Sequence, residues 1–242
     1  MDISPTQIER PKPLNPLLVD LNPGRIRIVV KGAGEVLVPK PGSNFIIKRG
    51  FDIIFSSAFI VLVLSWLIPL LAVLIKVNSK GPVFFLQKRT GLNGRVFTCI
   101  KLRTMRVNNS ADLKQAAHND ERITPLGHFL RNTNLDELPQ FINVLMGDMS
   151  VIGPRPHMVY HTKQFENKFE GYDRRLFVKP GLTGLAQIKG WRGPTPTQRS
   201  IYKRIQWDIY YVLHQNASLD SYIFFKTIVE VFANFYNQIF RT

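Results

Sequence analysis

An uncharged apolar run in the first third of the chain limits what this sequence can fold into. Residues 53–75 are 23 consecutive positions without a charged side chain. As an α-helix the run would be about 34 Å long, enough to cross a hydrocarbon layer of roughly 30 Å. Such a length exceeds that of most helices in soluble domains. The run therefore predicts a membrane helix.

A proline and the flanking charges favour a helix that enters one leaflet and returns. Pro69 has no N–H for the carbonyl of Ser65, so we expect a helix break between these residues, with the Ser65 hydroxyl helping to satisfy the freed group. Residues 1–50 carry eight basic and four acidic side chains, a surplus of positive charge that resists translocation, and basic residues also follow the run. One ordinary spanning helix is the alternative.

The overall charge calls for an anionic partner. The chain has 32 lysine and arginine residues against 17 acidic ones, a net charge of +15. This charge suits nucleic acid, anionic lipid headgroups or phosphorylated substrates. We expect no nucleic acid, because the basic residues are spread along a chain with a membrane helix and no nucleic-acid module is recognised.

The sequence divides into three parts. Residues 1–47 are rich in proline and predict a loose arm that ends in a small hairpin over residues 25–38. The polar start of this arm has no basic-then-apolar leader, so no signal peptide is expected. Residues 48–80 hold the membrane helix, and residues 81–242 form the third part.

The third part is predicted to be a mixed α/β (α+β) domain. Strands at residues 83–89 and 95–105 flank a turn that ends in Asn93-Gly94, which predicts a small antiparallel sheet. Cys99, the single cysteine, excludes an internal disulfide and is interpreted as a packed strand residue. Residues 107–124 are polar and irregular, which is typical of a mobile loop or a short exposed helix.

Apolar periodicity predicts helices in the remainder. One begins near Leu138 and ends at Gly147, and two more are expected at residues 201–213 and 222–240. The last helix has one apolar side that suits either a core or an interface with lipid. Its side chains there are Phe224, Ile228, Phe232, Phe235 and Ile239.

Two adjacent carboxylates, Asp136 and Glu137, lie at the predicted start of the helix that ends at Gly147. The simplest interpretation is structural: Asp136 caps the helix and Glu137 favours its positive end. The functional one is that a helix N-terminus also attracts anions, and that basic side chains converge there on a diphosphate and keep Asp136 ionised. The basic candidates are Arg131, Arg155, Lys101 and Arg103.

The functional interpretation assigns the two carboxylates different tasks. An ionised Asp136 could act as a nucleophile on phosphorus, while Glu137, about 100° further round a helix, could hold a divalent metal. Arg155 lies between Pro154 and Pro156, so a stiff turn would present its guanidinium.

Ordered sequence blocks over roughly residues 48–232 resemble the bacterial sugar transferases, the monotopic polyprenyl-phosphate phosphoglycosyl transferases. So many blocks in one order make coincidence implausible. The blocks are Lys48-Arg49-Gly50-Phe51-Asp52, Gly81-Pro82-Val83-Phe84-Phe85, Gly91-Leu92-Asn93-Gly94, Lys101-Leu102-Arg103-Thr104-Met105, Leu135-Asp136-Glu137-Leu138-Pro139-Gln140, Asn143, Gly147-Asp148-Met149-Ser150, Gly153-Pro154-Arg155-Pro156, Lys179-Pro180-Gly181-Leu182-Thr183-Gly184 and Ala186-Gln187.

The resemblance implies a fold and a place. It implies a monotopic protein of the bacterial inner (cytoplasmic) membrane, with a re-entrant helix, some interfacial helices, and residues 81–242 as a compact catalytic domain on the cytoplasmic face. The partners implied are a UDP-sugar donor, a polyprenyl (undecaprenyl) phosphate acceptor and membrane phospholipids. A homodimer is left open.

The resemblance also implies a two-step reaction. Asp136 would attack the β-phosphorus of the UDP-sugar, release UMP and carry the phosphosugar until the polyprenyl phosphate accepts it, in the first membrane step of polysaccharide or glycoconjugate synthesis. Glu137 would bind Mg²⁺, Arg131 and Arg155 match phosphate-binding positions, and Lys101 and Arg103 are further candidates. Two other functions compete: a metal-dependent glycosyl transferase that moves the sugar without its phosphate, and a non-catalytic basic protein at a membrane.

The sequence departs from the family pattern at two positions. Many members have a Ser-Pro pair at the helix break, whereas Ser65 is followed here by Trp66 and the proline comes at Pro69. Leu185 stands where some relatives have tryptophan, so this position predicts nothing about the sugar.

Overall fold

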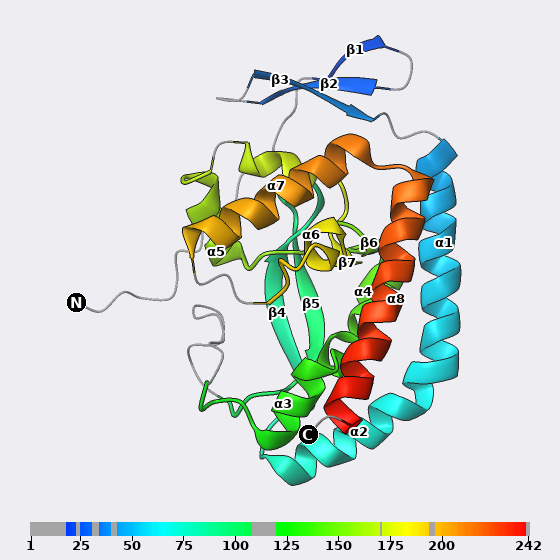
Figure 1. Cartoon of the computed structure of the whole chain (residues 1–242), viewed down its shortest axis with the longest axis vertical. Helices are drawn as coiled ribbons and strands as arrows, with labels where there is room; N and C mark the ends of the chain where they lie inside the picture. Colours follow the sequence, from blue (N-terminus) through cyan, green and yellow to red (C-terminus); the bar gives the residue numbers. More distant parts are fainter. Residues whose placement is uncertain are drawn as a thin grey trace, which may run out of the picture.

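A bent helix lies along the side and bottom of a mixed arrangement of helices and small sheets (Figure 1). The structure is a computed structural model. It describes residues 18–22, 25–30, 34–39, 43–107, 120–169, 171–193 and 197–240. The polar segment predicted at residues 107–124 and the start of the proline-rich arm therefore lie mostly outside the described residues.

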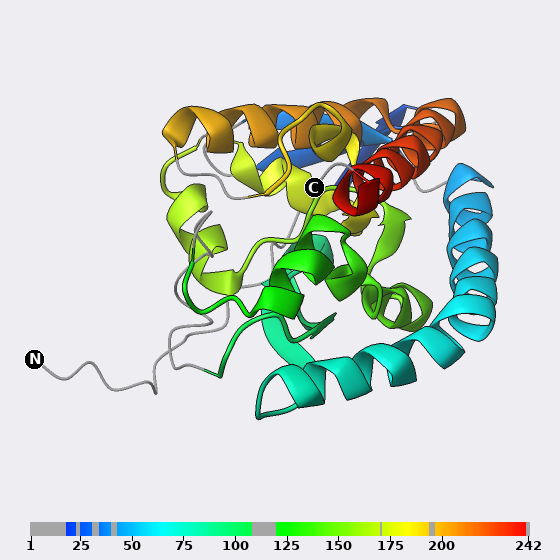
Figure 2. The same cartoon turned by 60° about the horizontal axis from the view of Figure 1, so that its bottom comes forward.

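The bent helix consists of two α-helices joined by a wider turn. Helix α1 (Ser43–Phe59) runs into a π-helical turn (Ile60–Leu64) and then into α2 (Ser65–Asn78). The two arms point in different directions and lie along adjacent sides of the molecule (Figure 2). Among the described residues one helix is long and apolar enough to cross a membrane, the segment Phe45–Asn78, with a mean hydropathy of 2.9 and 17% of its most apolar window buried.

The bend lies slightly earlier in the chain than the sequence predicts. The N–H of Ser65 reaches back to the carbonyl of Ile60, which makes the wide turn, and the Ser65 hydroxyl donates to the carbonyl of Val61 at 2.7 Å. The Trp66 indole N–H donates to the carbonyl of Leu62 at 3.0 Å. A π turn bends a helix in this way. Pro69 lies inside α2, so the predicted position of the break and the predicted partner of the Ser65 hydroxyl are both wrong.

Polar contacts fasten α1 to the rest of the molecule. The buried carboxylate of Asp52 accepts hydrogen bonds from the Ser150 hydroxyl at 3.0 Å and from the N–H of Val151 at 2.9 Å. One turn earlier, the Lys48 ammonium pairs with Asp220 at 2.7 Å. These contacts explain why an apolar helix carries charged residues near its start.

The central sheet is the predicted antiparallel pair. Strands β4 (Phe84–Thr90) and β5 (Val96–Leu102) are joined by a turn, Leu92–Gly94, in which Asn93 has a φ of 51°. Cys99 is fully buried on β5, as expected. A second pair was not predicted: β6 (Ser150–Ile152) and β7 (Gly181–Thr183) are parallel strands of three residues each, too short to leave a periodic pattern.

The described part of the arm contains one strand more than predicted. Strands β2 (Arg25–Val30) and β3 (Gly34–Pro39) pair in antiparallel register, which confirms the hairpin, and β1 (Leu18–Asn22) adds to the other edge of β2.

Helices cover the two pairs of strands. Those predicted from periodicity are present as α4 (Gln140–Met146), α7 (Gln198–His214) and α8 (Ala217–Phe240). Further short helices in the described residues are α3 (Pro125–Asn132), α5 (Val159–Glu166) and α6 (Leu185–Ile188), with a 3₁₀ segment at Tyr172–Phe177. Gly147 ends α4 with a φ of 93°, a conformation that favours glycine. A shared apolar core joins the bend, the central sheet, α4 and α8.

Helix α8 changes character along its length. Near its start Ile223 is fully buried and Phe224 packs against the core. Further along, Phe232 is 70% exposed, Phe240 is 68% exposed and Phe235 is 42% exposed. The aromatic side of the second half is therefore not part of this chain's core.

We expect Asp52→Ala to destabilise the fold, because it leaves the buried N–H of Val151 without an acceptor. The free energy of unfolding should fall by about 2–3 kcal/mol, a typical value for a hydrogen bond to a charged group. Thermal unfolding of the detergent-solubilised protein, followed by circular dichroism, measures it. Asp52→Asn keeps one accepting oxygen and should lose less. Equal melting temperatures for wild type and Asp52→Ala would contradict this role.

Candidate active site

The two adjacent carboxylates lie in a tight turn between α3 and α4. The turn is a 3₁₀ segment, Leu135–Glu137, entered through Asn134 in the left-handed conformation at φ 61°, which asparagine tolerates. Asp136 is 8% exposed and Glu137 is 9% exposed. The N-cap of α4 is Pro139 and no side chain caps it. The structural interpretation of Asp136 as a helix cap is therefore wrong.

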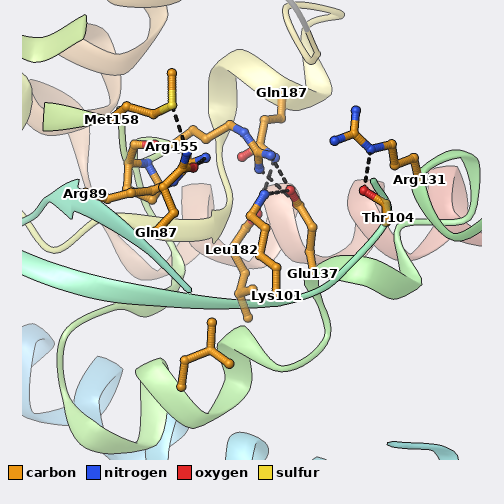
Figure 3. A network of polar contacts seen from close by, with 12 residues as sticks. Gln87, Arg89, Lys101, Thr104, Arg131, Glu137, Arg155, Met158, Leu182 and Gln187 are labelled. Atoms are coloured by element: carbon orange, nitrogen blue, oxygen red, sulfur yellow. Dashed lines mark hydrogen bonds and ion pairs between the residues drawn. The ribbon is translucent and has the colours of Figure 1, made fainter. Parts of the chain in front are cut away.

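Glu137 is the anion on which two basic residues converge (Figure 3). The Lys101 ammonium lies 2.7 Å from one oxygen of Glu137, which also accepts from Arg155, and the other oxygen accepts from Arg155 Nη1 at 2.9 Å. Burial alone would raise the pKa of Glu137, but the charges of Arg155 and Lys101 outweigh it and hold the pKa well below its usual range. Glu137 is therefore ionised, and the two cations neutralise its negative charge.

Two other arginines, the buried Arg175 and the partly buried Arg89, hold the backbone of the turn that presents Arg155. Arg175 donates to the carbonyl of Arg155 itself and pairs with Asp208 at 2.8 Å. Arg89 donates to the carbonyl of Pro156. Gly153, two residues before Arg155, packs so closely on the backbone of residues 179–181 that a Cβ at position 153 would clash.

Asp136 differs from its neighbour in having no direct partner. Within the described part of the chain its carboxylate has no hydrogen bond or ion pair. Burial, followed by the charge of Glu137, raises the pKa of Asp136 to about 6, although Lys101, Arg131 and Arg155 act in the opposite direction. At pH 7 the ionised form still predominates, as expected, but the cations do not bring the pKa below its ordinary value.

Of the other predicted residues, one lies at the site and one does not. Arg131, on α3, donates through Nε to the Thr104 hydroxyl at 2.8 Å, and its charge acts on Asp136 (Figure 3). Arg103 instead donates to carbonyls at the end of α2, among them Ser79 at 2.7 Å and Ile75 at 3.4 Å. The structure thus brings Lys101, Arg131 and Arg155 together with the carboxylates, and it uses Arg103 to close a helix.

Sequence reasoning missed two residues of this site. Arg192 follows α6, and within the described residues its guanidinium has no hydrogen bond or ion pair, although its charge interacts with those of Arg155, Glu137 and Asp136. Gln187 is drawn in Figure 3 with the polar network around Glu137, and its buried side-chain oxygen has no partner in the described part of the chain. Glycines on both sides of Trp191-Arg192 were the available signal, because such spacing indicates a tightly shaped loop.

The carboxylates offer a limited metal site. No group of three or more His, Cys, Asp or Glu side chains suited to a metal is found in the described ranges. Mg²⁺ is often bound by one or two carboxylates together with substrate phosphates, and Asp136 with Glu137 fits that pattern. Both oxygens of Glu137 already accept hydrogen bonds from cations, so an ion at Glu137 would share it with Lys101 and Arg155.

An enclosed pair of carboxylates, one neutralised and one not, among several basic side chains is chemically suited to phosphoryl transfer. The model of the bacterial sugar transferase family matches residues 43–234. The chain therefore belongs to this family, which confirms the resemblance seen in the motifs.

Relatives within the family act on different sugars. A UDP-glucose:undecaprenyl-phosphate glucose-1-phosphate transferase of Klebsiella pneumoniae is 47% identical over 197 residues, 81% of this chain and 42% of the relative. A UDP-N-acetylgalactosamine-undecaprenyl-phosphate N-acetylgalactosaminephosphotransferase of Aeromonas hydrophila is 40% identical over 201 residues, 82% of this chain and 46% of the relative. The chain thus spans under half the length of both.

A shorter relative matches over nearly its full length. The exopolysaccharide production protein PSS of Rhizobium leguminosarum bv. phaseoli is 42% identical over 191 residues, which make up 77% of this chain and 95% of the relative. The matched unit therefore also occurs in a relative without a long extension.

We expect opposite stability effects from the two matched substitutions Asp136→Asn and Glu137→Gln. Because its pKa is raised from 3.8 to about 6, ionised Asp136 opposes folding by an amount that grows over this pH interval and is constant above it. Asp136→Asn should therefore raise the melting temperature at pH 8, and the gain should shrink as the pH falls from 6 towards 4. Glu137 has a lowered pKa and stabilises the fold at neutral pH, so Glu137→Gln should lower the melting temperature by several degrees. Circular dichroism melts at pH 8 and pH 5 compare the two variants. Equal melting temperatures at pH 8 would contradict the assigned charge states.

Proposed function

We propose that this chain transfers a phosphosugar from a UDP-sugar to undecaprenyl phosphate or another polyprenyl phosphate, giving a polyprenyl-diphosphate sugar and UMP. The observation that carries the proposal is Asp136: a buried carboxylate without a partner, next to a carboxylate that cations neutralise. A group whose ionised form is poorly solvated, yet ionised at pH 7, is suited to nucleophilic attack on phosphorus. The names of the relatives support the donor and acceptor classes.

The reaction has two displacements at one phosphorus atom. In the first, an oxygen of Asp136 forms a bond to the β-phosphorus, and the bond from that phosphorus to the bridging oxygen breaks, so that UMP leaves with the electron pair. In the second, a phosphate oxygen of the polyprenyl phosphate attacks the same phosphorus and the Asp136 carboxylate is the leaving group. Nothing is oxidised or reduced, and Asp136 returns to its starting state.

The basic side chains stabilise the charge that moves during these steps. Of Lys101, Arg131, Arg155 and Arg192, the basic side chains assigned to the site, Arg131 and Arg192 have no carboxylate partner among the described residues, so they are the best placed to bind the diphosphate. Lys101 and Arg155 hold Glu137 and contribute their field. When bound at Glu137, Mg²⁺ would supply further neutralisation of the diphosphate.

The apolar surfaces support a membrane location. We place the bend between α1 and α2 inside one leaflet, because the exposed apolar segment is interrupted at its middle and charged residues lie near both ends. The exposed aromatic side of α8, in its second half, would lie against phospholipid at the membrane surface. The site would then lie on the cytoplasmic face of the bacterial inner membrane, where both substrates are within reach.

We expect a covalent adduct when the protein is mixed with a UDP-sugar and Mg²⁺ without an acceptor. Intact-protein mass spectrometry should show a gain equal to one phosphosugar, together with release of UMP. Asp136→Asn should show neither, because the amide is not a nucleophile at phosphorus.

Two outcomes of this experiment contradict the proposal. Release of UDP instead of UMP would indicate a glycosyl transferase that moves the sugar alone. Steady turnover of donor and acceptor with no adduct at any time would indicate direct transfer between the substrates.

Activity should fall on the acidic side of neutral pH. Because the pKa of Asp136 is raised to about 6, lowering the pH through 6 protonates the nucleophile and removes its charge. Initial rates of UMP release at saturating substrates, between pH 5 and pH 8, test this. A rate that stays constant down to pH 5 would exclude Asp136 as the ionised nucleophile.

A further inference from the structure

The loop that carries Arg192 is fixed at several backbone atoms. It follows α6, and the N–H of Trp191 donates to the carbonyl of Ala186 at 3.0 Å. Gly190 and Gly193 have φ values of 83° and 84°, a conformation that residues with a side chain rarely adopt. Arg192 is thus presented by a loop of defined shape.

A single side chain from another helix holds the loop on both sides of Arg192. Arg204, on α7 and 4% exposed, donates through Nε to the carbonyl of Trp191 at 3.0 Å and through Nη2 to the carbonyl of Gly193 at 2.6 Å. The planar fork of a guanidinium can reach two acceptors in this way, whereas a lysine has one nitrogen.

The placement of Arg204 is electrostatically unfavourable. Burial, and then the nearby charge of Arg155, lowers the pKa of Arg204 to about 10, with Asp208 acting in the opposite direction and Arg175 and Arg89 adding repulsion. Asp208 is already paired with Arg175. A cation buried among other cations, with its donors bonded to the carbonyls of one loop, is hard to explain by stability alone.

We infer that Arg204 is a positioning residue, which sets the backbone of residues 191–193 so that Arg192 meets the diphosphate of the sugar nucleotide. The inference rests on the proposed function. It has a parallel in the same site, where Arg175 bonds to the carbonyl of Arg155 and fixes the other arginine-bearing turn. An outer set of buried arginines thus orients the guanidiniums that face the substrates.

Steady-state kinetics test the inference. They compare Arg204→Lys, Arg192→Met and the double variant with the wild-type protein, all in lipid nanodiscs. The lysine keeps the charge but cannot bond to both carbonyls, so the KM for the UDP-sugar should rise about tenfold while the KM for undecaprenyl phosphate stays within about twofold. If Arg204 acts through Arg192, the double variant should be no worse than Arg192→Met alone. Arg199→Lys, on the exposed side of the same helix, is the matched control and should match wild type.

A second variant keeps the test independent of whether Arg204→Lys folds. The added methyl group of Gly193→Ala meets no neighbouring atom, but the φ of 84° at this position is strained for alanine. The substitution should therefore shift the loop backbone without changing Arg204, and it should raise the KM for the UDP-sugar in the same way. A lower melting temperature of Arg204→Lys and Gly193→Ala without a change in the KM for the UDP-sugar would show a purely structural role and overturn the inference. Additive effects in the double variant would do the same. Absence of turnover by wild type with any UDP-sugar would overturn the proposed function, and the inference with it.

Discussion

The arrangement of charge around two neighbouring carboxylates is the constraint on which the site depends. Glu137 takes the two nearest cations, Lys101 and Arg155, and this leaves Asp136 buried beside a negative charge without a partner of its own. Had the cations been shared equally, the pKa of both carboxyl groups would lie low. The inequality follows from geometry, because adjacent residues in a 3₁₀ turn point in different directions.

The rest of the fold maintains this unequal pairing of the two carboxylates with cations. Strand β5 supplies Lys101, the turn after β6 supplies Arg155, and the loop after α6 supplies Arg192. Each loop arginine is steadied at its backbone by a further buried arginine, Arg175 or Arg204. Such a rigid surrounding suits phosphoryl transfer, where most of the catalytic effect comes from positioning and electrostatics.

The bent helix shows how far local sequence signals reach. The apolar run, Ser65 and Pro69 predicted a break, and a break is present, but a π turn places it before Ser65. Periodicity likewise predicted α4, α7, α8 and the β4–β5 pair, because each buries one face along a continuous stretch. It missed the parallel β6–β7 pair, since three residues joined to a distant partner have no pattern of their own.

The sequence by itself determined the family, the helix that is long and apolar enough to cross a membrane, the two acids and most of the cations near them, because these depend on residue type and order. Only the tertiary structure decided which acid is neutralised, why Arg103 closes a helix instead of joining the site, and that Arg192 belongs to it. The physical reason is that a charge acts through distance and burial, and both are set by contacts between segments far apart in the chain.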